Sequence, residues 1–303
     1  MLPNRLITLF ALLSVAFSFS VRAQPEADVN VSQGGYGMVR TNITTGYDHN
    51  WGKITNSYAT RVSYEFLRNR RFTLTANARY ASVETDFDAS DISGGYSPQA
   101  IGLNGTHMIG QAGFTGMYRT TLFGRPFMAM AMLNSEWGQG GFARISGIAM
   151  GLIMLRANRD TQFGIGPLAL LNSTSKIPAF LVFMYRHRIN EKWLINLYGG
   201  MLGIDYTPTR HDLISAGADV DVKAFYFRPH DPTLPSKCRF TYTTVRPSLR
   251  YRRTLARHLY LDIQGGVAVR MSCRVNGVTG TKEYIRCHQK AAPFFHIGAS
   301  YSL

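Results

Sequence analysis

After residue 23 the sequence contains no uncharged apolar run of the roughly 18 residues that a membrane-spanning helix requires. It has no glycine-rich phosphate loop, no paired-carboxylate motif and no nucleotide-binding signature. Acidic residues are few, 18 against 33 lysines and arginines, and the formal net charge is +15. These absences argue against a helical membrane protein and against a nucleotide-dependent enzyme.

The first 23 residues have the layout of a secretory signal peptide. Met1–Arg5 is short and positive, Leu6–Phe19 is apolar and uncharged, and Val21-Arg22-Ala23 supplies a small-residue cleavage site. We expect residues 1–23 to be removed and the remainder to be exported. An exported protein rarely meets nucleic acid, so the positive charge does not indicate a nucleic-acid partner.

What is present is a repeated alternation of apolar and polar residues. In Phe72–Val83, Phe72, Leu74, Ala76, Ala78 and Tyr80 alternate with Thr73, Thr75, Asn77 and Arg79. His258–Ser272 shows the same period. A period of two indicates strands with one apolar and one polar face. The 29 glycines, 18 phenylalanines and 16 tyrosines agree with an all-β chain.

Short basic turns separate these alternating segments. Five segments have this character: Leu67–Arg71, Phe123–Pro126, Arg156–Asp160, Arg188–Lys192 and Arg252–Arg257. The intervening connections are expected to be longer: Asp48–Lys53, Phe87–Gly105, Ser135–Gly141, Asn172–Pro178, Asp205–Arg239 and Arg274–Lys290. Short turns at one end and long loops at the other are typical of transmembrane β-barrels, whose short turns are periplasmic.

This layout predicts about twelve antiparallel strands, with both termini in the periplasm. Asp212–Arg228 also alternates in part, but we interpret it as an outer loop because counting it gives an odd number of strands. Fourteen strands remain an alternative. Residues 24–35 are expected to form a short periplasmic segment and residues 36–303 the barrel.

The C-terminal segment is the most informative part of the chain. Its alternate residues are apolar or small: Phe295, Ile297, Ala299, Tyr301 and Leu303. This ending resembles the closing strand of bacterial outer-membrane β-barrels, where the assembly machinery reads a terminal aromatic or large apolar residue. The strand–basic turn–strand pattern of Tyr64–Phe72 is similar to that of uncharacterised, medium-sized (about 12-stranded) outer-membrane barrel families of Bacteroidota.

The resemblance implies an all-β, transmembrane, antiparallel up-and-down β-barrel in the bacterial outer membrane. Its partners would be outer-membrane lipids and the barrel-assembly machinery. Such families imply no agreed biochemical activity.

The inward residues of the first and last strands predict a polar, basic wall in the lumen. Its expected members are Arg40, Arg61, Arg79, Arg246, Arg250 and Arg270, with Glu65, Asp262 and His296. Glu65 and Asp262 can pair with some of the arginines, and the remaining positive charge would attract anions.

The middle strands differ, because Thr106–Gly203 is rich in methionine. Both faces are apolar in Phe127–Leu133 and in Ile148–Leu155, so this sector of the lumen is apolar whichever face points inward. It could bind an amphipathic or lipidic ligand. Alternatively, the lumen is closed by its own side chains. Copper binding by methionine is a third, remoter interpretation.

The three cysteines, Cys238, Cys273 and Cys287, all fall in expected outer loops. A disulfide between Cys273 and Cys287 is the favoured interpretation, although Cys238 could compete for either thiol. Cys287-His288 is a weak metal signal without further ligands at suitable spacing. We predict no metal ligands, no cofactor and no catalytic residues, because the histidines are scattered.

The leading hypothesis is a passive or facilitated channel for small anionic or amphipathic solutes. The alternative is a non-conducting structural or accessory barrel whose outer loops bind a partner. A lipid-modifying enzyme of the outer membrane comes third.

Overall fold

The computed structural model describes residues 40–171, 179–198, 201–278 and 282–302. The expected signal peptide, the segment 24–35, the first barrel residues 36–39, the loop 172–178 and Leu303 lie outside this range. Among the described residues, no helix is long and apolar enough to cross a membrane.

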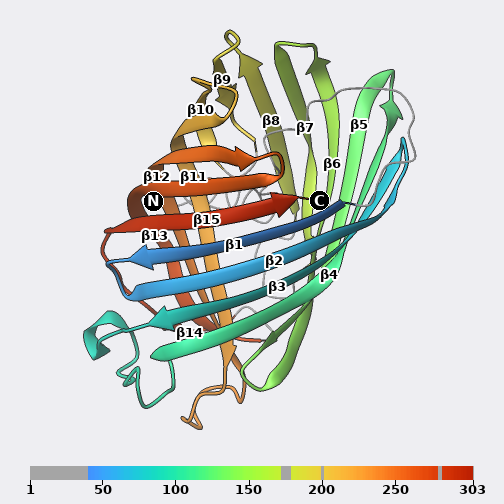
Figure 1. Cartoon of the computed structure of the whole chain (residues 1–303). Helices are drawn as coiled ribbons and strands as arrows, with labels where there is room; N and C mark the ends of the chain where they lie inside the picture. The colour runs from blue at the N-terminus through green and yellow to red at the C-terminus, as the bar shows by residue number, and fades with distance from the viewer. Residues whose placement is uncertain (1–39, 172–178, 199–200, 279–281, 303) are drawn as a thin grey trace, which may run out of the picture.

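The described residues form one antiparallel sheet of 15 strands (Figure 1). The strands are β1 (Arg40–Asn50), β2 (Ile54–Arg68), β3 (Phe72–Thr85), β4 (Gly105–Leu122), β5 (Arg125–Gly138), β6 (Gly141–Ala157), β7 (Thr161–Leu171), β8 (Ala179–Arg188), β9 (Trp193–Asn196), β10 (Leu202–Tyr206), β11 (Asp212–Phe227), β12 (Cys238–Ala256), β13 (Leu259–Gly277), β14 (Glu283–Arg286) and β15 (Ala292–Ser302). A short 3-10 helix, η1 (Ala89–Asp91), lies between β3 and β4.

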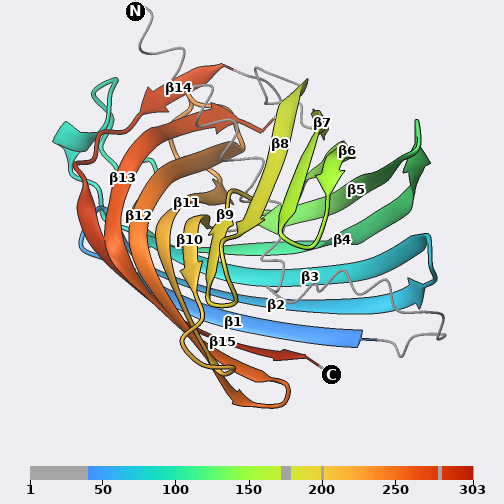
Figure 2. The same ribbon diagram turned by 90° about the horizontal axis from the view of Figure 1, so that it is seen from above.

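The sheet closes on itself, which confirms the predicted antiparallel barrel. Neighbours along the chain pair from β1 to β13, and β15 pairs with both β13 and β1 (Figures 1 and 2). Fourteen strands therefore form the ring, while β14 lies outside it against β13. Every strand of the ring thus has a paired neighbour on each side. The pairing is partial between β8 and β11, because β9 pairs with β8 only over Arg186–Arg188 and β10 pairs with β11 only over Ile214–Ala218.

The predicted number of twelve strands is wrong, and the alternative of fourteen is correct. Residues 193–206 do not form one strand: Trp193–Asn196 and Leu202–Tyr206 pair with each other, so the chain reverses between them. Asp212–Phe227, expected in an outer loop, is instead strand β11 of the wall, paired along its whole length with β12. The division of residues 193–206 into two strands and the addition of β11 raise the number of strands in the ring from twelve to fourteen, which is still even.

The five predicted turns are confirmed, and a sixth at residues 207–211 joins β10 to β11. In the two-residue turn between β4 and β5, Phe123 and Gly124 both have positive φ, 52° and 71°. This is the conformation that a two-residue hairpin needs to follow the twist of its strands. Two connections expected to be long, Asp48–Lys53 and Ser135–Gly141, are in fact short turns. Only residues 51–53 and 139–140 lie between the strands that they join.

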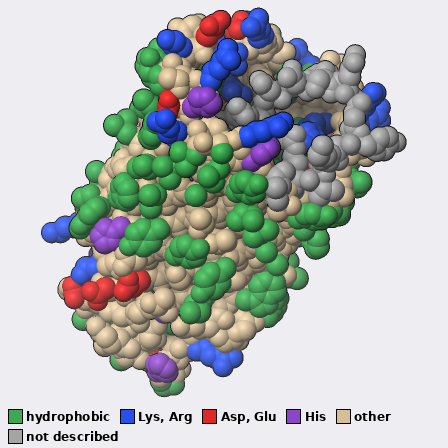
Figure 3. Space-filling view, in the orientation of Figure 1, with side chains coloured by type: hydrophobic (Ala, Val, Ile, Leu, Met, Phe, Trp, Pro, Cys, Tyr) green, Lys and Arg blue, Asp and Glu red, His purple; other side chains and the backbone are tan. Residues whose placement is uncertain are grey.

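Side chains alternate between a buried inward face and an exposed outward face. In β2, Val62, Tyr64 and Phe66 are exposed, and in β15 Phe295, Ile297 and Tyr301 are exposed. Figure 3 shows apolar side chains spread over this face of the barrel, with most charged side chains towards its ends. An outward apolar band between polar rims is the surface that suits a lipid bilayer.

Candidate functional site

The inward surface of the barrel has three parts, built by different strands. Charged residues line β11, β12, β13, β15, β1 and β2. Apolar residues line β5 to β8, on the opposite side of the ring. A third group of apolar side chains fills the end of the lumen near the β3–β4 connection, called the outer end below.

Arg246 lies at the centre of the charged sector. Its guanidinium donates to both carboxylate oxygens of Asp219, at 2.9 and 2.7 Å, and to Asp48 at 3.3 Å. Asp221 lies 3.6 Å away. The guanidinium also lies over the ring of Phe294, at 4.7 Å from its centroid. Two parallel hydrogen bonds to one carboxylate give this pair both strength and a defined orientation.

Lys223 and His296 complete this arrangement. Lys223 Nζ donates to Ser57 Oγ at 2.6 Å and lies 3.8 Å from Asp221. His296 Nδ1 is 3.0 Å from Asp48 Oδ1. We call Asp48, Asp219, Asp221, Lys223, Arg246 and His296 the lumen network. Its two permanent cations face three carboxylates.

The lumen network crosses the interior of the barrel. Lys223 belongs to β11 and Ser57 to β2, and four strands of the ring, β12, β13, β15 and β1, separate them. A direct hydrogen bond between these residues therefore spans the lumen. The charged sector is thus an internal brace as well as a wall.

A second group of ion pairs lies nearer the short turns. Arg250 and Arg252 both donate to Asp262, through their Nε atoms at 2.8 and 3.1 Å. Farther along β13, towards the outer end, Arg270 donates to the carbonyl oxygen of Cys287. Arg250 and Arg270, both predicted on this wall, thus donate hydrogen bonds to neighbouring oxygen atoms.

The predicted basic-wall residues other than Arg40 are brought to the inward face, although they do not form one cluster. Arg61 and Arg79 are register partners on β2 and β3, and Arg79 donates to Gln111 at 3.4 Å. Glu65 lies 3.5 Å from Arg68. Arg40 begins β1, opposite Glu65 in register, and its side chain lies outside the described part of the chain.

Sequence reasoning identified Asp262 as an acidic partner but missed the charged residues around Arg246. Asp219, Asp221 and Lys223 were assigned to a loop, and Asp48 to the start of another. The alternation of Asp219, Asp221 and Lys223 with Val220 and Val222 was the available signal. These carboxylates offset much of the positive charge that was expected to face the lumen.

The apolar sector, which we call the methionine wall, lies on β5 to β8. Its buried residues are Met130, Ile148, Met150, Leu152, Leu168 and Val182, with Met128, Met132, Leu170, Phe180 and Tyr198 packed against them. Met130 pairs with Met150, and Met150 pairs with Leu168, so neighbouring strands place these side chains on one face. The prediction of an apolar sector is confirmed.

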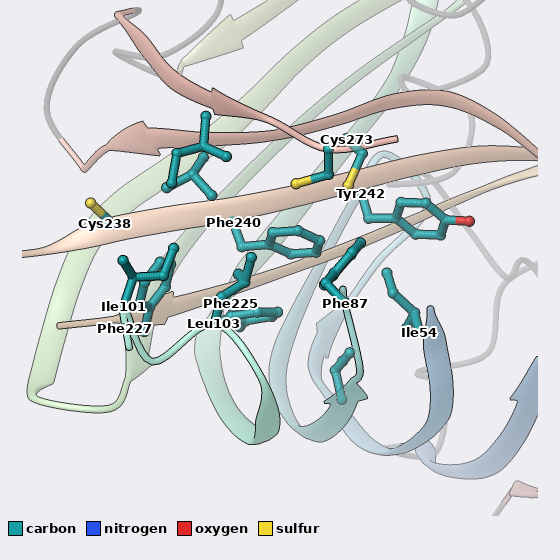
Figure 4. Close-up of a cluster of buried hydrophobic side chains, with 14 of the residues drawn as sticks. Ile54, Phe87, Ile101, Leu103, Phe225, Phe227, Cys238, Phe240, Tyr242 and Cys273 are labelled. Atoms are coloured by element: carbon teal, nitrogen blue, oxygen red, sulfur yellow. The ribbon is translucent and has the colours of Figure 1, made fainter. Parts of the chain in front are cut away.

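The outer end of the lumen is filled by a group that we call the outer cluster (Figure 4). Its members include Ile54, Phe87, Ile101, Leu103, Phe225, Phe227, Phe240, Tyr242, Val275 and Ile285. Phe225 stacks on Phe240 at 4.7 Å and on His107 at 3.8 Å between ring centroids. Because Phe87, Ile101 and Leu103 come from the β3–β4 connection, that connection folds back over the barrel mouth.

Polar contacts hold both sides of the outer cluster in place. Lys53 forms ion pairs with Asp88 and Asp91, which join the β3–β4 connection to the β1–β2 turn. The hydrogen bond to Asp88 raises the pKa of the Lys53 ammonium. On the other side, Tyr226 donates to Glu136, which also lies 3.1 Å from Arg144. A Cβ atom added to Gly138 would lie 2.7 Å from Tyr226 Cβ, so β5 and β11 approach closely here.

The prediction that all three cysteines lie in loops is wrong. Cys238 begins β12 and Cys273 lies within β13. Cys287 donates its backbone N–H to the carbonyl of Cys273 at 2.9 Å, so the two residues predicted to pair are neighbours. All three are buried free thiols here, and the disulfide stays a prediction. Among the described residues, no group of three or more His, Cys, Asp or Glu side chains is placed to hold a metal ion.

Comparison with known proteins gives architectural likenesses only. No family model and no curated protein sequence matches the chain. An outer membrane channel from Pseudomonas putida F1 matches 90% of this chain and 100% of its own, with 9% identity and a TM-score of 0.45. The Pseudomonas putida toluene transporter TodX matches 87% of this chain and 89% of its own, with 9% identity and a TM-score of 0.43. The KdgM porin matches 86% and 99%, with 9% identity and a TM-score of 0.34. Likenesses at this level assign neither a solute nor a mechanism to this chain.

Proposed function

We propose that the chain is a bacterial outer-membrane barrel that provides facilitated passage for small amphipathic solutes, without enzymatic activity. The observation that carries the proposal is the two-sided lumen. The methionine wall offers a flexible apolar surface, and the charged sector opposite offers arginines and carboxylates. A solute with an apolar body and a polar or anionic head has a matching partner on each side.

The exposed surface supports the membrane location. Large apolar side chains such as Leu181, Leu249 and Ile145 are about two-thirds exposed, at 65, 64 and 66%. Side chains of this kind gain free energy when lipid replaces water around them. The first strand begins and the last strand ends at the end of the barrel where the short turns lie, and we expect that end to face the periplasm.

Amphipathic solutes fit better than simple inorganic anions. Arg246, Arg250 and Arg252 have carboxylate partners, so these three arginines leave little uncompensated positive charge to concentrate anions. The outer cluster fills the barrel mouth in this state, so we expect the resting ion conductance to be low. Passage would require the outer cluster to separate, and an apolar solute can replace the contacts that are lost.

The test compares two methionines that differ in the direction they face. Met130 is buried in the methionine wall, while Met108 on β4 is 54% exposed on the outward face. Vesicles containing the folded protein would be tested for uptake of octanoate and, in parallel, of hydrophilic gluconate. Met130→Gln places an amide in the apolar wall, so we expect octanoate uptake to fall about five- to ten-fold. Met108→Gln is the matched control and should leave uptake unchanged.

The two solutes separate the possible outcomes. Preference for octanoate, with loss of that preference in Met130→Gln alone, supports the proposal. Equal passage of octanoate and gluconate in the wild type would contradict it and indicate an unselective pore.

A second candidate is a non-conducting accessory barrel whose outer loops bind a partner. The filled outer end favours it, because 18 buried residues close the lumen there. No uptake of either solute by a folded wild-type barrel, together with no ion current, would favour this function over the first.

A further inference from the structure

The rim with the short turns carries a groove that neither the lumen nor the proposed transport uses. It has a volume of about 410 Å³ and is lined by His211, Arg253, Thr254, Leu255, Ala256 and Arg257. Two adjacent connections build it, the β10–β11 turn and the β12–β13 hairpin. Thr254 donates its backbone N–H to the carbonyl of His211 at 2.8 Å, which fixes the two sides relative to each other.

We propose that this groove, the rim groove, binds the phosphate headgroup of an anionic phospholipid. Three of its six lining residues, His211, Arg253 and Arg257, can carry positive charge. Arginine is the side chain best suited to a phosphate, since its planar fork can donate two parallel hydrogen bonds. The exposed positions of these residues leave their donors accessible to a headgroup.

One acidic residue lies beside the rim groove, and its charge is largely engaged by its own neighbours. Asp212 accepts hydrogen bonds from Thr209 and Tyr251, at 2.5 and 2.6 Å. Arg253 lies 3.9 Å from Asp212, a distance that leaves part of its guanidinium available. The local charge of the groove therefore remains positive.

The surface next to the rim groove explains why the ligand is a lipid. Leu255 lines the groove and is 54% exposed, and Ile214 and Leu249 are exposed on the outward faces of β11 and β12. Ile214 pairs with Tyr251 near the rim. The next pair on the same face, Ala216 with Leu249, lies two residues farther from the rim. Acyl chains attached to a headgroup in the groove can lie along this apolar strip.

The experiment measures the affinity of the folded full chain for phosphatidylglycerol, against a phosphatidylcholine background. Arg253→Gln/Arg257→Gln removes two charges from the groove. The matched control, Arg70→Gln/Arg159→Gln, removes two charges from other turns of the same rim. A cation close to an anionic membrane surface contributes a few-fold to about ten-fold in affinity, so we expect at least a roughly ten-fold loss in the groove variant. Both pairs are exposed, and the heat-dependent shift in gel mobility reports whether each variant is folded.

Three outcomes decide the proposal. A loss in the groove variant that is clearly larger than in the control supports the rim groove as a lipid site. Equal losses in both variants would overturn it, because the attraction would then belong to the rim as a whole. Full competition by inorganic phosphate, with no effect of Leu249→Ser on lipid affinity, would also overturn it in favour of a site for soluble phosphate.

Discussion

The two sides of the lumen are stabilised in opposite ways. In the lumen network every charge depends on particular partners, so Arg246 is held by three carboxylates and Asp48 by groups on β11, β12 and β15. In the methionine wall, contacts between neighbouring apolar side chains are interchangeable. A sector built from specific pairs has one arrangement, whereas a sector built from thioethers and aliphatic groups can adjust to what it meets. The lumen network is thus the rigid side of the ring, and the methionine wall is the adaptable side.

The largest expected effect comes from breaking the lumen network at its centre. Arg246→Ala leaves Asp219 and its neighbours buried without their main cation, so we expect a loss of about 3–5 kcal/mol in the free energy of unfolding. Urea titration of the protein in lipid vesicles measures it. Arg246→Lys keeps the charge but loses the paired hydrogen bonds. Its free energy of unfolding should lie between those of the wild type and of Arg246→Ala. A loss below about 1 kcal/mol for Arg246→Ala would show that water enters and replaces the pairs.

A smaller and more graded effect is expected on the other side. Met130→Ala removes a buried side chain and should cost about 2–4 kcal/mol. Met130→Leu, of similar volume, should cost less than about 1.5 kcal/mol because the neighbours can adjust. The same titration measures both. If the leucine variant lost as much as the alanine variant, the methionine wall would be as specific as the lumen network, and the contrast between the two sides would fail.

The smallest effect concerns the hydrogen bond between Lys223 and Ser57 that spans the lumen. Ser57→Ala removes the acceptor of the bond from Lys223, while Asp48 and Asp221 remain near that ammonium group. We expect a loss of about 1 kcal/mol. Ser63→Ala, which removes a hydroxyl bonded to Asn77 on the neighbouring strand, provides a comparison within the wall. A loss of 3 kcal/mol or more for Ser57→Ala would mean that this one bond controls the whole network.

Periodicity was sufficient to predict much of this fold. Segments such as Phe72–Val83 and His258–Ser272 alternate strictly, because one face meets the exterior and the other the lumen. The turns were recognisable because polar and glycine-containing pairs such as Phe123–Gly124 interrupt that alternation. Where both faces are buried, the signal weakens: β11 carries Phe225, Tyr226 and Phe227 in succession, since its outer end lies between the outer cluster and Glu136.

The candidate site was only half predictable for a related reason. Inward positions follow from alternation, so Arg246, Arg250 and Asp262 could be identified. Their partners depend on which strands meet across the lumen, and that depends on the number of strands and the shape of the ring. Asp219 and Lys223 could not be placed until β11 was known to belong to the wall.

The seam between β1 and β15 has a consequence for how the barrel is made. Asp48 stands on one side of this seam and His296 on the other, 248 residues apart along the chain, and Asp48 also meets Arg246 across a gap of 198 residues. Bringing such distant segments together costs chain entropy before any contact forms. Because the charges of the lumen network satisfy one another only when the two ends of the chain meet, a half-closed ring leaves buried charges without partners. Closure is therefore cooperative, and the same network that braces the finished barrel disfavours an incompletely assembled one.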